Sequence, residues 1–517
     1  MKKIITLFVL LILASCNQEK KEVKFIPLTT NSIEAKKAFM EGVYRFDQNE
    51  INESRAAYKK AVELDDDFLL AKVYYNSTIP SENRERIIYS YENRDNVSQI
   101  EKKIIEANYK MQVYGDFKGA ISIFDTLISN NPDIPFLYET TGYMKSFNKD
   151  FDKAIEYWKK AIELNPNSYF SAICLGLLNV TVGTSFMPLP EEKRNLEEGK
   201  KWLELAAKMR PEASATPRFM GNIYRAENEL DKALDAYRLA VNKNVNKSSQ
   251  LMEQTLMVGH TLNAMGKYDE ARSEYLNTIN VSINDFWWAQ NHVYYSYTLL
   301  AEKRYDEAIR FLSKAQHDLS QKNISKEILD FSLNRIEFNK WLIIAHSLRK
   351  DEADISLNKL NQRREKDYEK SMLEAIDELE KENLTRNFMV GNLSNQAWSS
   401  IIFGEYDLAR ESLNKMYEIQ KNRLADNPDA LNRFNALSGY LNLMEGNIEE
   451  SINFYNKRKE RGDLGEYHNY FYALSLKANG ESDKSKQILI SLANNPFSDW
   501  GIAIVKNLAK AQIKTNI

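Results

Sequence analysis

Residues 149–166 read KDFDKAIEYWKKAIELNP, and this stretch carries the pattern that decides the fold. A polar turn is followed by an aromatic residue, two polar residues and the small residue Ala154. Trp158 lies four places after Ala154, so a helix would place both on the same face. Pro166 follows the apolar run, and proline cannot continue a helical hydrogen-bond ladder. The stretch therefore predicts a turn and then a helix that buries a small and an aromatic residue together.

The same pattern returns along the chain. The matching turn segments are GDFKGA (115–120), KDFDKA (149–154), NELDKA (228–233), GKYDEA (266–271), KRYDEA (303–308), GEYDLA (404–409), GNIEES (446–451) and GESDKS (480–485). The helix before the turn supplies a small residue at Gly42, Gly142, Gly176, Gly221, Gly259 and Gly439, and the helix after it supplies Tyr58, Phe124, Trp158, Tyr237 and Tyr275. The steps from Ala120 to Ala154 and from Ser451 to Ser485 are each 34 residues. A fixed period of this length predicts a stack of two-helix units.

The period and the order of small and aromatic residues resemble the tetratricopeptide repeat family. The resemblance covers most of residues 34–510 and implies an all-α, right-handed α-α superhelix (a TPR solenoid) of about 11–12 helical pairs. One pair cannot bury its apolar face alone, so pairs have to stack. The last residues, WGIAIVKNLAKAQIK (500–514), are typical of an amphipathic helix that covers the end of such a stack.

The pattern also divides the chain. We expect a signal peptide at 1–15, a lipidated tether at 16–33, an N-terminal repeat array at 34–320, a degenerate long-helix segment at 321–388, and a C-terminal array with its capping helix at 389–517. The fourth of these segments lacks the clear turn motif, although its length leaves room for degenerate pairs.

The N-terminus, MKKIITLFVLLILASC (1–16), has two lysines, an apolar run and small residues before Cys16. The apolar run has about ten residues, whereas a membrane-spanning helix needs about 20. This is the layout of a secretory signal peptide. The last four residues resemble the lipobox of bacterial lipoproteins, which implies cleavage before Cys16 and its acylation. Asn17 follows, and in that family an asparagine here favours the outer membrane; whether the protein faces the periplasm or the cell surface stays open.

The composition limits which classes of partner the protein can bind. The formal net charge is −3, and loss of Lys2 and Lys3 with the leader takes it to −5. Such a chain has no cationic footprint for nucleic acid. Charged residues at 28% and hydrophobic residues at 43% are typical of a folded protein rather than a disordered one. With Cys16 acylated, Cys174 has no partner for an intramolecular disulfide.

No catalytic motif is found. The phosphate-binding GxxxxGK[ST] loop, the GxSxG elbow and the HExxH zinc motif are all missing from the sequence. The five histidines, at 260, 292, 317, 346 and 468, lack metal-ligand spacing. We therefore expect no enzyme, no metal and no cofactor.

The resemblance implies that the first helix of each pair lines a concave wall that touches ligands. Arg218, Asn222 and Arg225 are spaced four and three apart, so they share a helix face and could hold a carboxylate such as a peptide C-terminus. They resemble part of the carboxylate clamp of chaperone-binding members, but Met257, Gln290 and Tyr294 do not complete it. The alternative is a solvated polar face with local ion pairs.

Aromatic residues form a second candidate on the same wall. Trp398, Tyr440 and Tyr470 occupy equivalent positions on successive first helices, and Trp287, Trp288, Tyr294 and Tyr297 crowd an earlier pair. Such a ladder could grip an extended peptide or a sugar. The alternative is that some of these rings belong to the core between repeats.

Together these patterns predict a non-catalytic envelope lipoprotein whose repeat array binds a protein or peptide at the membrane. The alternative is a glycan-capture lipoprotein that resembles the repeat-containing partners of outer-membrane transporters. That class carries large irregular insertions, and the insertions in this sequence are short.

Overall fold

The computed structural model describes residues 23–77, 79–180, 189–244, 250–496 and 499–514. Within these ranges the chain is all-α, as the sequence predicts, and forms 25 α-helices, α2 to α26. The 24 helices α2 to α25 form twelve successive pairs, and α26 follows them. The leader and residues 16–22 lie outside the described residues. Residues 23–32 are not the extended tether that the sequence predicts: Ile26 is buried in a hydrophobic core cluster, and the Thr29 N–H donates to the Glu101 carboxylate at 2.8 Å, so this segment packs against the first helices before α2 begins.

The first half holds six pairs. Their helices are α2 (Ile33–Asp47), α3 (Ile51–Leu64), α4 (Leu69–Tyr74), α5 (Pro80–Glu92), α6 (Gln99–Tyr114), α7 (Phe117–Asn130), α8 (Pro135–Phe147), α9 (Phe151–Leu164), α10 (Tyr169–Leu177), α11 (Leu196–Met209), α12 (Ala215–Ala226) and α13 (Leu230–Lys243).

The second half holds six further pairs and the last helix. These are α14 (Gln250–Ala264), α15 (Tyr268–Asn280), α16 (Asp285–Ala301), α17 (Tyr305–Ser320), α18 (Lys326–His346), α19 (Lys350–Leu373), α20 (Glu378–Ile402), α21 (Tyr406–Gln420), α22 (Asn432–Met444), α23 (Ile448–Lys459), α24 (Glu466–Ala478), α25 (Ser482–Asn494) and α26 (Trp500–Lys514).

Five of the twelve pairs are held by a glycine on the first helix and an aromatic ring on the second, whereas Gly176 of α10 lies against the aliphatic Leu203 of α11. A Cβ atom built on Gly142 would lie 2.7 Å from Nε1 of Trp158, and one on Gly221 would lie 2.5 Å from Cε1 of Tyr237. The rings of Trp158 and Tyr237 are fully buried. Gly42 with Tyr58, Gly259 with Tyr275 and Gly439 with Tyr455 repeat the contact. The sequence prediction that small residues admit aromatic rings between paired helices is confirmed.

The turn inside a pair has a fixed conformation. In ten of the twelve pairs a single turn residue adopts a positive φ, two places after the end of the first helix or, for Gly115, one place after it. These residues are Asn49, Gly115, Lys149, Asn228, Gly266, Lys303, Leu348, Gly404, Gly446 and Gly480. In most of these turns the next N–H donates to a carbonyl five residues back, as Asp150 does to Lys145 at 2.9 Å. This left-handed C-cap satisfies carbonyls at the helix end that would otherwise lack a donor.

The same turn occurs inside the stretch 321–388, where the sequence motif is weak. Leu348 has a φ of 61° between α18 and α19, and Ala353 is fully buried in the position of the small residue. Helices α18, α19 and α20 have 21, 24 and 25 residues, so the stretch is a repeat pair with elongated helices and the start of the next pair.

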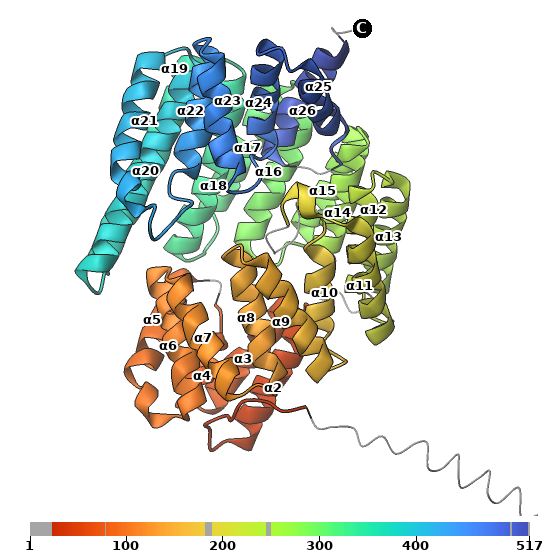
Figure 1. The fold of residues 1–517 in the computed structure, drawn as a ribbon, viewed down its shortest axis with the longest axis vertical. Coiled ribbons are helices and arrows are strands. Elements are labelled where there is room, and N and C mark those ends of the chain that lie inside the picture. Colours follow the sequence, from red (N-terminus) through yellow and green to blue (C-terminus); the bar gives the residue numbers. More distant parts are fainter. Residues whose placement is uncertain (1–22, 78, 181–188, 245–249, 497–498, 515–517) are drawn as a thin grey trace, which may run out of the picture.

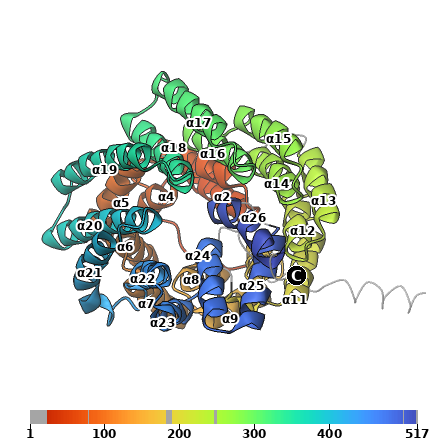
Figure 2. The same ribbon diagram turned by 90° about the horizontal axis from the view of Figure 1, so that it is seen from above.

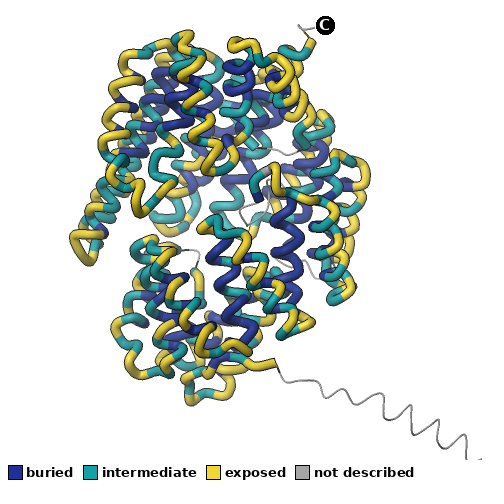
Figure 3. Tube along the Cα trace, in the orientation of Figure 1, coloured by how far each residue is buried: buried dark blue, intermediate teal, exposed yellow. Residues whose placement is uncertain are grey.

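The pairs stack into a superhelix that passes over itself. Seen along its axis, α12, α14 and α16 lie nearer the centre than α13, α15 and α17 (Figure 2). In side view, α2 to α9 form a lower tier and α16 to α26 an upper tier, joined by α10 to α15 (Figure 1). Buried residues follow the inner side of both tiers (Figure 3). None of the helices in the described residues has the length and apolar character needed to cross a bilayer.

Polar contacts join the two tiers where they face each other. Lys149 of the lower tier donates to the Asp429 carboxylate at 2.6 Å and to the carbonyl of Arg461 at 2.7 Å. Tyr114 donates to Asp377 at 2.5 Å, and Lys118 donates to the carbonyl of Asp426 at 2.8 Å. Further contacts between the tiers are Arg84 with Glu380 and Ser81 with Glu327, and Arg194 of the connecting segment pairs with Asp463 of the upper tier. These contacts are charged or hydroxylic, unlike the apolar packing inside each tier.

Helix α26 closes the upper tier. It packs against α16, α24 and α25, and buries Ile502, Val505 and Ala509. Asn507 donates to the carbonyl of Ala301 at the end of α16. The expected capping helix is therefore present, but it covers helices more than 200 residues earlier as well as the last pair.

The glycine–ring contact predicts a sharp effect of added volume. Gly221→Val would place a branched side chain within the Tyr237 ring, and we expect it to lower the free energy of unfolding by about 1–3 kcal/mol. Urea denaturation followed by circular dichroism measures this. The control is Ala56→Val, a similar change at an exposed position of α3. Equal effects of the two changes would contradict the packing argument.

The polar contacts between tiers predict that charge reversal opens the superhelix. In Arg84→Glu with Lys149→Glu, two carboxylates face Glu380 and Asp429, and we expect a larger radius of gyration by small-angle X-ray scattering. The control, Lys153→Glu with Lys160→Glu, makes the same charge change in pairs within α9. An unchanged radius at low salt, where screening is weakest, would contradict the prediction.

Candidate binding surfaces

The three residues of the predicted carboxylate clamp lie on α12 but contact different partners. Arg218 pairs with Glu253 of α14 and lies over the Phe219 ring. Asn222 is buried and accepts a hydrogen bond from the Tyr237 hydroxyl at 2.6 Å. Arg225 has 2% of its surface exposed. The structure therefore does not bring the three together around one open position.

The guanidinium of Arg225 binds the segment that leads into α26. Its Nη2 and Nε atoms donate to the carbonyl of Pro496 at 3.2 and 3.3 Å. Nearby, Lys506 donates to the carbonyls of Ala264 at 3.1 Å and Asn495 at 2.9 Å. The concave wall at α12 and α14 is thus occupied by the chain itself. A ligand role for Arg218, Asn222 and Arg225 stays a prediction, because a ligand would first have to displace this segment.

Trp398 lies in an aromatic cluster at the centre of the upper tier. Its ring centroid is 5.1 Å from that of Trp341, 5.4 Å from Tyr467 and 5.3 Å from Trp500. The four rings come from α18, α20, α24 and α26. The Tyr467 hydroxyl lies 3.2 Å from Nε1 of Trp398 and 3.1 Å from Nε2 of His346. Burial lowers the pKa of His346 to about 4, so its ring is neutral at physiological pH.

Tyr440 and Tyr470 belong to the same core. Tyr440 packs on Phe471 with ring centroids 4.0 Å apart, and both tyrosines are buried. The sequence interpretation that these positions form an aromatic ladder on an open wall does not match this placement. The physical reason is curvature: first helices from non-adjacent pairs meet across the axis, so their inward rings fill the centre. The structure places Trp398, Tyr440 and Tyr470 in the hydrophobic core, which is the alternative interpretation of these rings.

A pair of carboxyl groups lies where α24 and α26 begin. Glu466 and Asp499 interact through their side chains, and Asn495 donates to Glu466 at 3.4 Å. Asp499 also accepts from the N–H of Ile502 at 2.7 Å as the cap of α26. Burial, together with the neighbouring Asp499 charge, raises the pKa of Glu466 to about 8. Glu466 therefore binds a proton more tightly in the folded chain than in the unfolded one.

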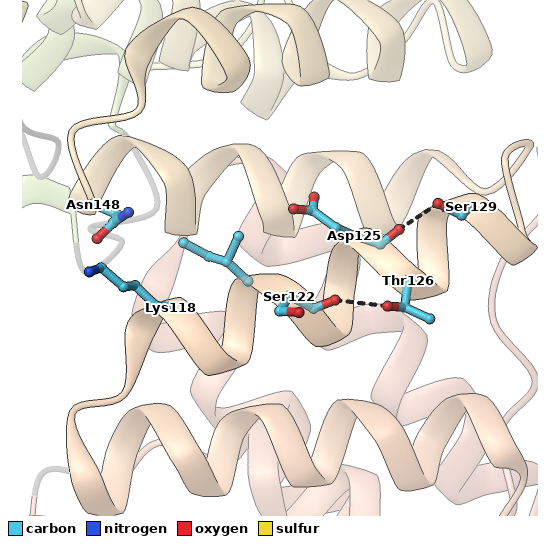
Figure 4. Close-up of a pocket in the computed structure, with 7 residues that line it drawn as sticks. Lys118, Ser122, Asp125, Thr126, Ser129 and Asn148 are labelled. Atoms are coloured by element: carbon cyan, nitrogen blue, oxygen red, sulfur yellow. Dashed lines mark hydrogen bonds between the residues drawn. The ribbon is translucent and has the colours of Figure 1, made fainter. Parts of the chain in front are cut away.

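A shallow hollow beside α7 is lined mainly by polar side chains, and several of them are already hydrogen-bonded. Thr126 and Ser129 donate to carbonyls one turn earlier in the same helix, at 3.0 Å each (Figure 4). Asp125 accepts from Lys145 at 3.0 Å and from the Tyr157 hydroxyl at 2.9 Å. The hollow measures about 410 Å³ and is better explained as a groove between surface side chains than as a site.

A larger groove separates the two tiers, and we call it the inter-tier groove. It encloses about 870 Å³ and is lined by α3, α5 and α6 below and by α16, α18 and α19 above. Phe286, Trp287 and Phe331 form an aromatic wall; the rings of Phe286 and Phe331 lie 5.3 Å apart. Phe331 has 62% of its surface exposed. Arg55 and Arg84 line the opposite wall.

Sequence reasoning named Trp287 but missed the rest of this groove. The one local signal of this groove in the sequence is the aromatic side chain of Phe331 on an otherwise polar helix face. Its neighbours Ser81 and Arg84 lie about 250 residues earlier in the chain, and a repeat pattern says nothing about contacts over that separation.

The described part of the chain offers no cluster of three or more histidine, cysteine, aspartate or glutamate side chains that could hold a metal ion. Cys174 is a free, buried thiol, and burial raises its pKa.

Comparison with known proteins finds one matching family model and a set of similar solved structures. The tetratricopeptide repeat family model matches residues 137–168, which span most of α8 and all of α9. Yeast Tom70 is a structural neighbour at 17% identity, covering 62% of this chain and 67% of that one with a TM-score of 0.40. A monomeric mutant of IFIT1 with Gppp-AAAA is another at 15%, covering 84% and 92% with a TM-score of 0.33. Scores this low carry no argument about this chain. No curated protein sequence matches it.

The chain is thus a helical repeat protein built from stacked pairs. It contains a tetratricopeptide repeat at residues 137–168; the glycine–ring contact of that repeat recurs in four other pairs, and its left-handed turn recurs in nine other pairs.

The raised pKa of Glu466 predicts a pH-dependent stability. The protonated carboxyl contributes stability below its ordinary pKa of 4.5, and this contribution is lost as the pH rises towards about 8. Glu466→Gln keeps a neutral side chain, so its free energy of unfolding should fall less between these two pH values. Urea denaturation at both ends of the range measures this. Glu450→Gln, an exposed change on α23, is the control; identical pH profiles for wild type and Glu466→Gln would contradict the prediction.

Proposed function

We propose that this chain is a lipid-anchored, non-catalytic scaffold of a bacterial envelope that binds a protein partner through its repeat surface. The observation that carries the proposal is that the described helices α2 to α25 all belong to repeat pairs, whose buried side chains pack one helix against another. Stacked repeats create extended surfaces that suit macromolecular partners.

The anchor rests on the sequence. Lys2, Lys3, the apolar run and the lipobox-like residues before Cys16 support export and acylation. Asn17 favours the outer membrane. Residues 17–22 would then serve as a short tether that, fully extended, spans about 20 Å. The repeat array would therefore lie close to the bilayer surface, where it could meet a partner in the envelope.

Partner binding is tested by capture from cross-linked envelopes with the tagged full-length protein. The proposal expects a defined protein that copurifies with the wild-type chain. It also expects that protein to be lost with Arg84→Glu and Lys149→Glu, which disturb the spacing of the tiers, but kept with Lys153→Glu and Lys160→Glu. Absence of any specific protein would count against the scaffold role.

Membrane attachment is tested at Cys16. We expect Cys16→Ser to move the protein from the membrane fraction to the soluble fraction, because an acyl chain supplies about 0.8 kcal/mol per buried methylene. Fractionation followed by immunoblotting measures the shift. Cys174→Ala, which removes the other thiol, is the control and should stay with the membrane. Retention of the Cys16→Ser protein in the membrane fraction would refute the anchor.

A further inference from the structure

Four arginines lie around the middle of α20, and we call them the arginine cluster. Arg364 comes from α19, Arg386 from α20 itself, Arg423 from the short 3-10 turn after α21, and Arg433 is the second residue of α22. Helices α19 and α20 reach further towards the lower tier than α22 does (Figure 1). The cluster therefore lies where the start of α22 meets the longer helix α20.

Arg364 and Arg433 place two like charges beside each other. A Cβ atom on Gly391 of α20 would overlap the guanidinium of Arg364, so α20 admits this side chain because residue 391 is a glycine. Burial lowers the pKa of Arg364, and the positive charge of Arg433 lowers it further. Burial also lowers the pKa of Arg433, although part of its side chain is exposed. Both charges are thus held in surroundings that disfavour them.

No carboxylate neutralises this pair. Among the described residues none forms an ion pair with Arg364 or Arg433, and none raises the pKa of either guanidinium. Glu365 follows Arg364 directly, but adjacent residues of a helix do not face the same side. The pair therefore keeps its positive charge.

The other two arginines add to this charge. Glu382 lies one turn before Arg386 and raises its pKa, while burial and the neighbouring Arg423 lower it. Asp426 is exposed, three residues after Arg423, and forms no ion pair with it in the described part of the chain. Even with both of these carboxylates counted, the arginine cluster has a net positive charge.

One donor of the cluster also lacks an acceptor. Arg386 donates through Nη2 to the side-chain oxygen of Asn383, but its Nε atom is buried with no hydrogen-bond partner among the described residues. Buried polar groups are nearly always hydrogen-bonded. This donor and the two unneutralised guanidiniums together favour a ligand that brings several anionic oxygens.

A phosphate group has the chemistry that this arrangement suits. Guanidinium groups bind phosphate oxygens through paired, charge-assisted hydrogen bonds. A phosphate monoester carries a charge of about −1.5 to −2 at neutral pH, enough to offset most of the charge of two arginines, whereas a carboxylate brings a single charge. We propose that the arginine cluster binds the phosphate group of a ligand, with Arg364 and Arg433 contacting its oxygens and with Arg386 and Arg423 beside them. This site does not depend on the scaffold role, because it needs no protein partner.

Isothermal titration calorimetry with the full-length chain tests the site. We expect saturable binding of glucose 6-phosphate, competition by inorganic phosphate, and no binding of glucose. Arg433→Gln removes one charge, and Gly391→Ala keeps every charge but displaces the Arg364 guanidinium. We expect each to weaken binding of glucose 6-phosphate by about tenfold or more. The matched control is Arg238→Gln, at an exposed position of α13, which should bind like wild type.

Thermal unfolding by circular dichroism separates loss of the site from loss of the fold. Arg433→Gln removes a repulsion, so without phosphate it should unfold at the wild-type temperature or above it. Added phosphate should raise the unfolding temperature of wild type and of Arg238→Gln, because a ligand of the folded state stabilises that state. It should not raise that of Arg433→Gln.

Titration with dihexanoyl phosphatidylglycerol, a short-chain lipid that dissolves in water, identifies the source of the phosphate. Binding of glucose 6-phosphate alone that depends on Arg433 supports the site and assigns it to a soluble ligand. Binding of the lipid that depends on Arg433 supports the site and assigns it to a headgroup. The proposal is overturned if glucose 6-phosphate, inorganic phosphate and the lipid all fail to bind, or if Arg433→Gln and Gly391→Ala bind as tightly as Arg238→Gln.

Discussion

The contact between a glycine on the first helix of a pair and an aromatic ring on the second fixes the geometry of five of the twelve helix pairs. With no Cβ on Gly142 or Gly221, the rings of Trp158 and Tyr237 lie directly against the neighbouring backbone. That close approach sets the orientation of the two helices in these pairs, and stacking of similar pairs along the chain produces the superhelix. The long-range contacts, such as Ser81 with Glu327, are consequences of this local rule applied many times.

The pair and its repetition could be predicted from sequence because they depend on contacts within about one period. Gly42, Gly142 and Gly221, and the rings of Tyr58, Trp158 and Tyr237, were identified from spacing alone and occupy the predicted contact. The elongated pair α18–α19 was harder to predict from the sequence, because Leu348 occupies the left-handed turn position that is often glycine or asparagine in the other pairs. A leucine there gives no local signal.

The candidate site could not be predicted in the same way. Whether Trp398 faces an open wall or a filled centre depends on how tightly the superhelix curves, and curvature is the sum of small rotations between many pairs. In this chain the curvature brings α18, α20, α24 and α26 together, so Trp341, Trp398, Tyr467 and Trp500 become core. The same curvature creates the inter-tier groove from α5, α16 and α18, which no sequence window contains.

The two kinds of interface have different physical character, and this difference identifies the part of the molecule that responds to its surroundings. Within a tier, helices are joined by buried apolar side chains, whose removal from water is strongly favourable and insensitive to salt. Between tiers, Lys149 with Asp429 and Tyr114 with Asp377 are partly exposed polar contacts, each of which contributes little because water and ions compete for it. Changing the spacing between the tiers therefore requires less free energy than separating the helices within a tier.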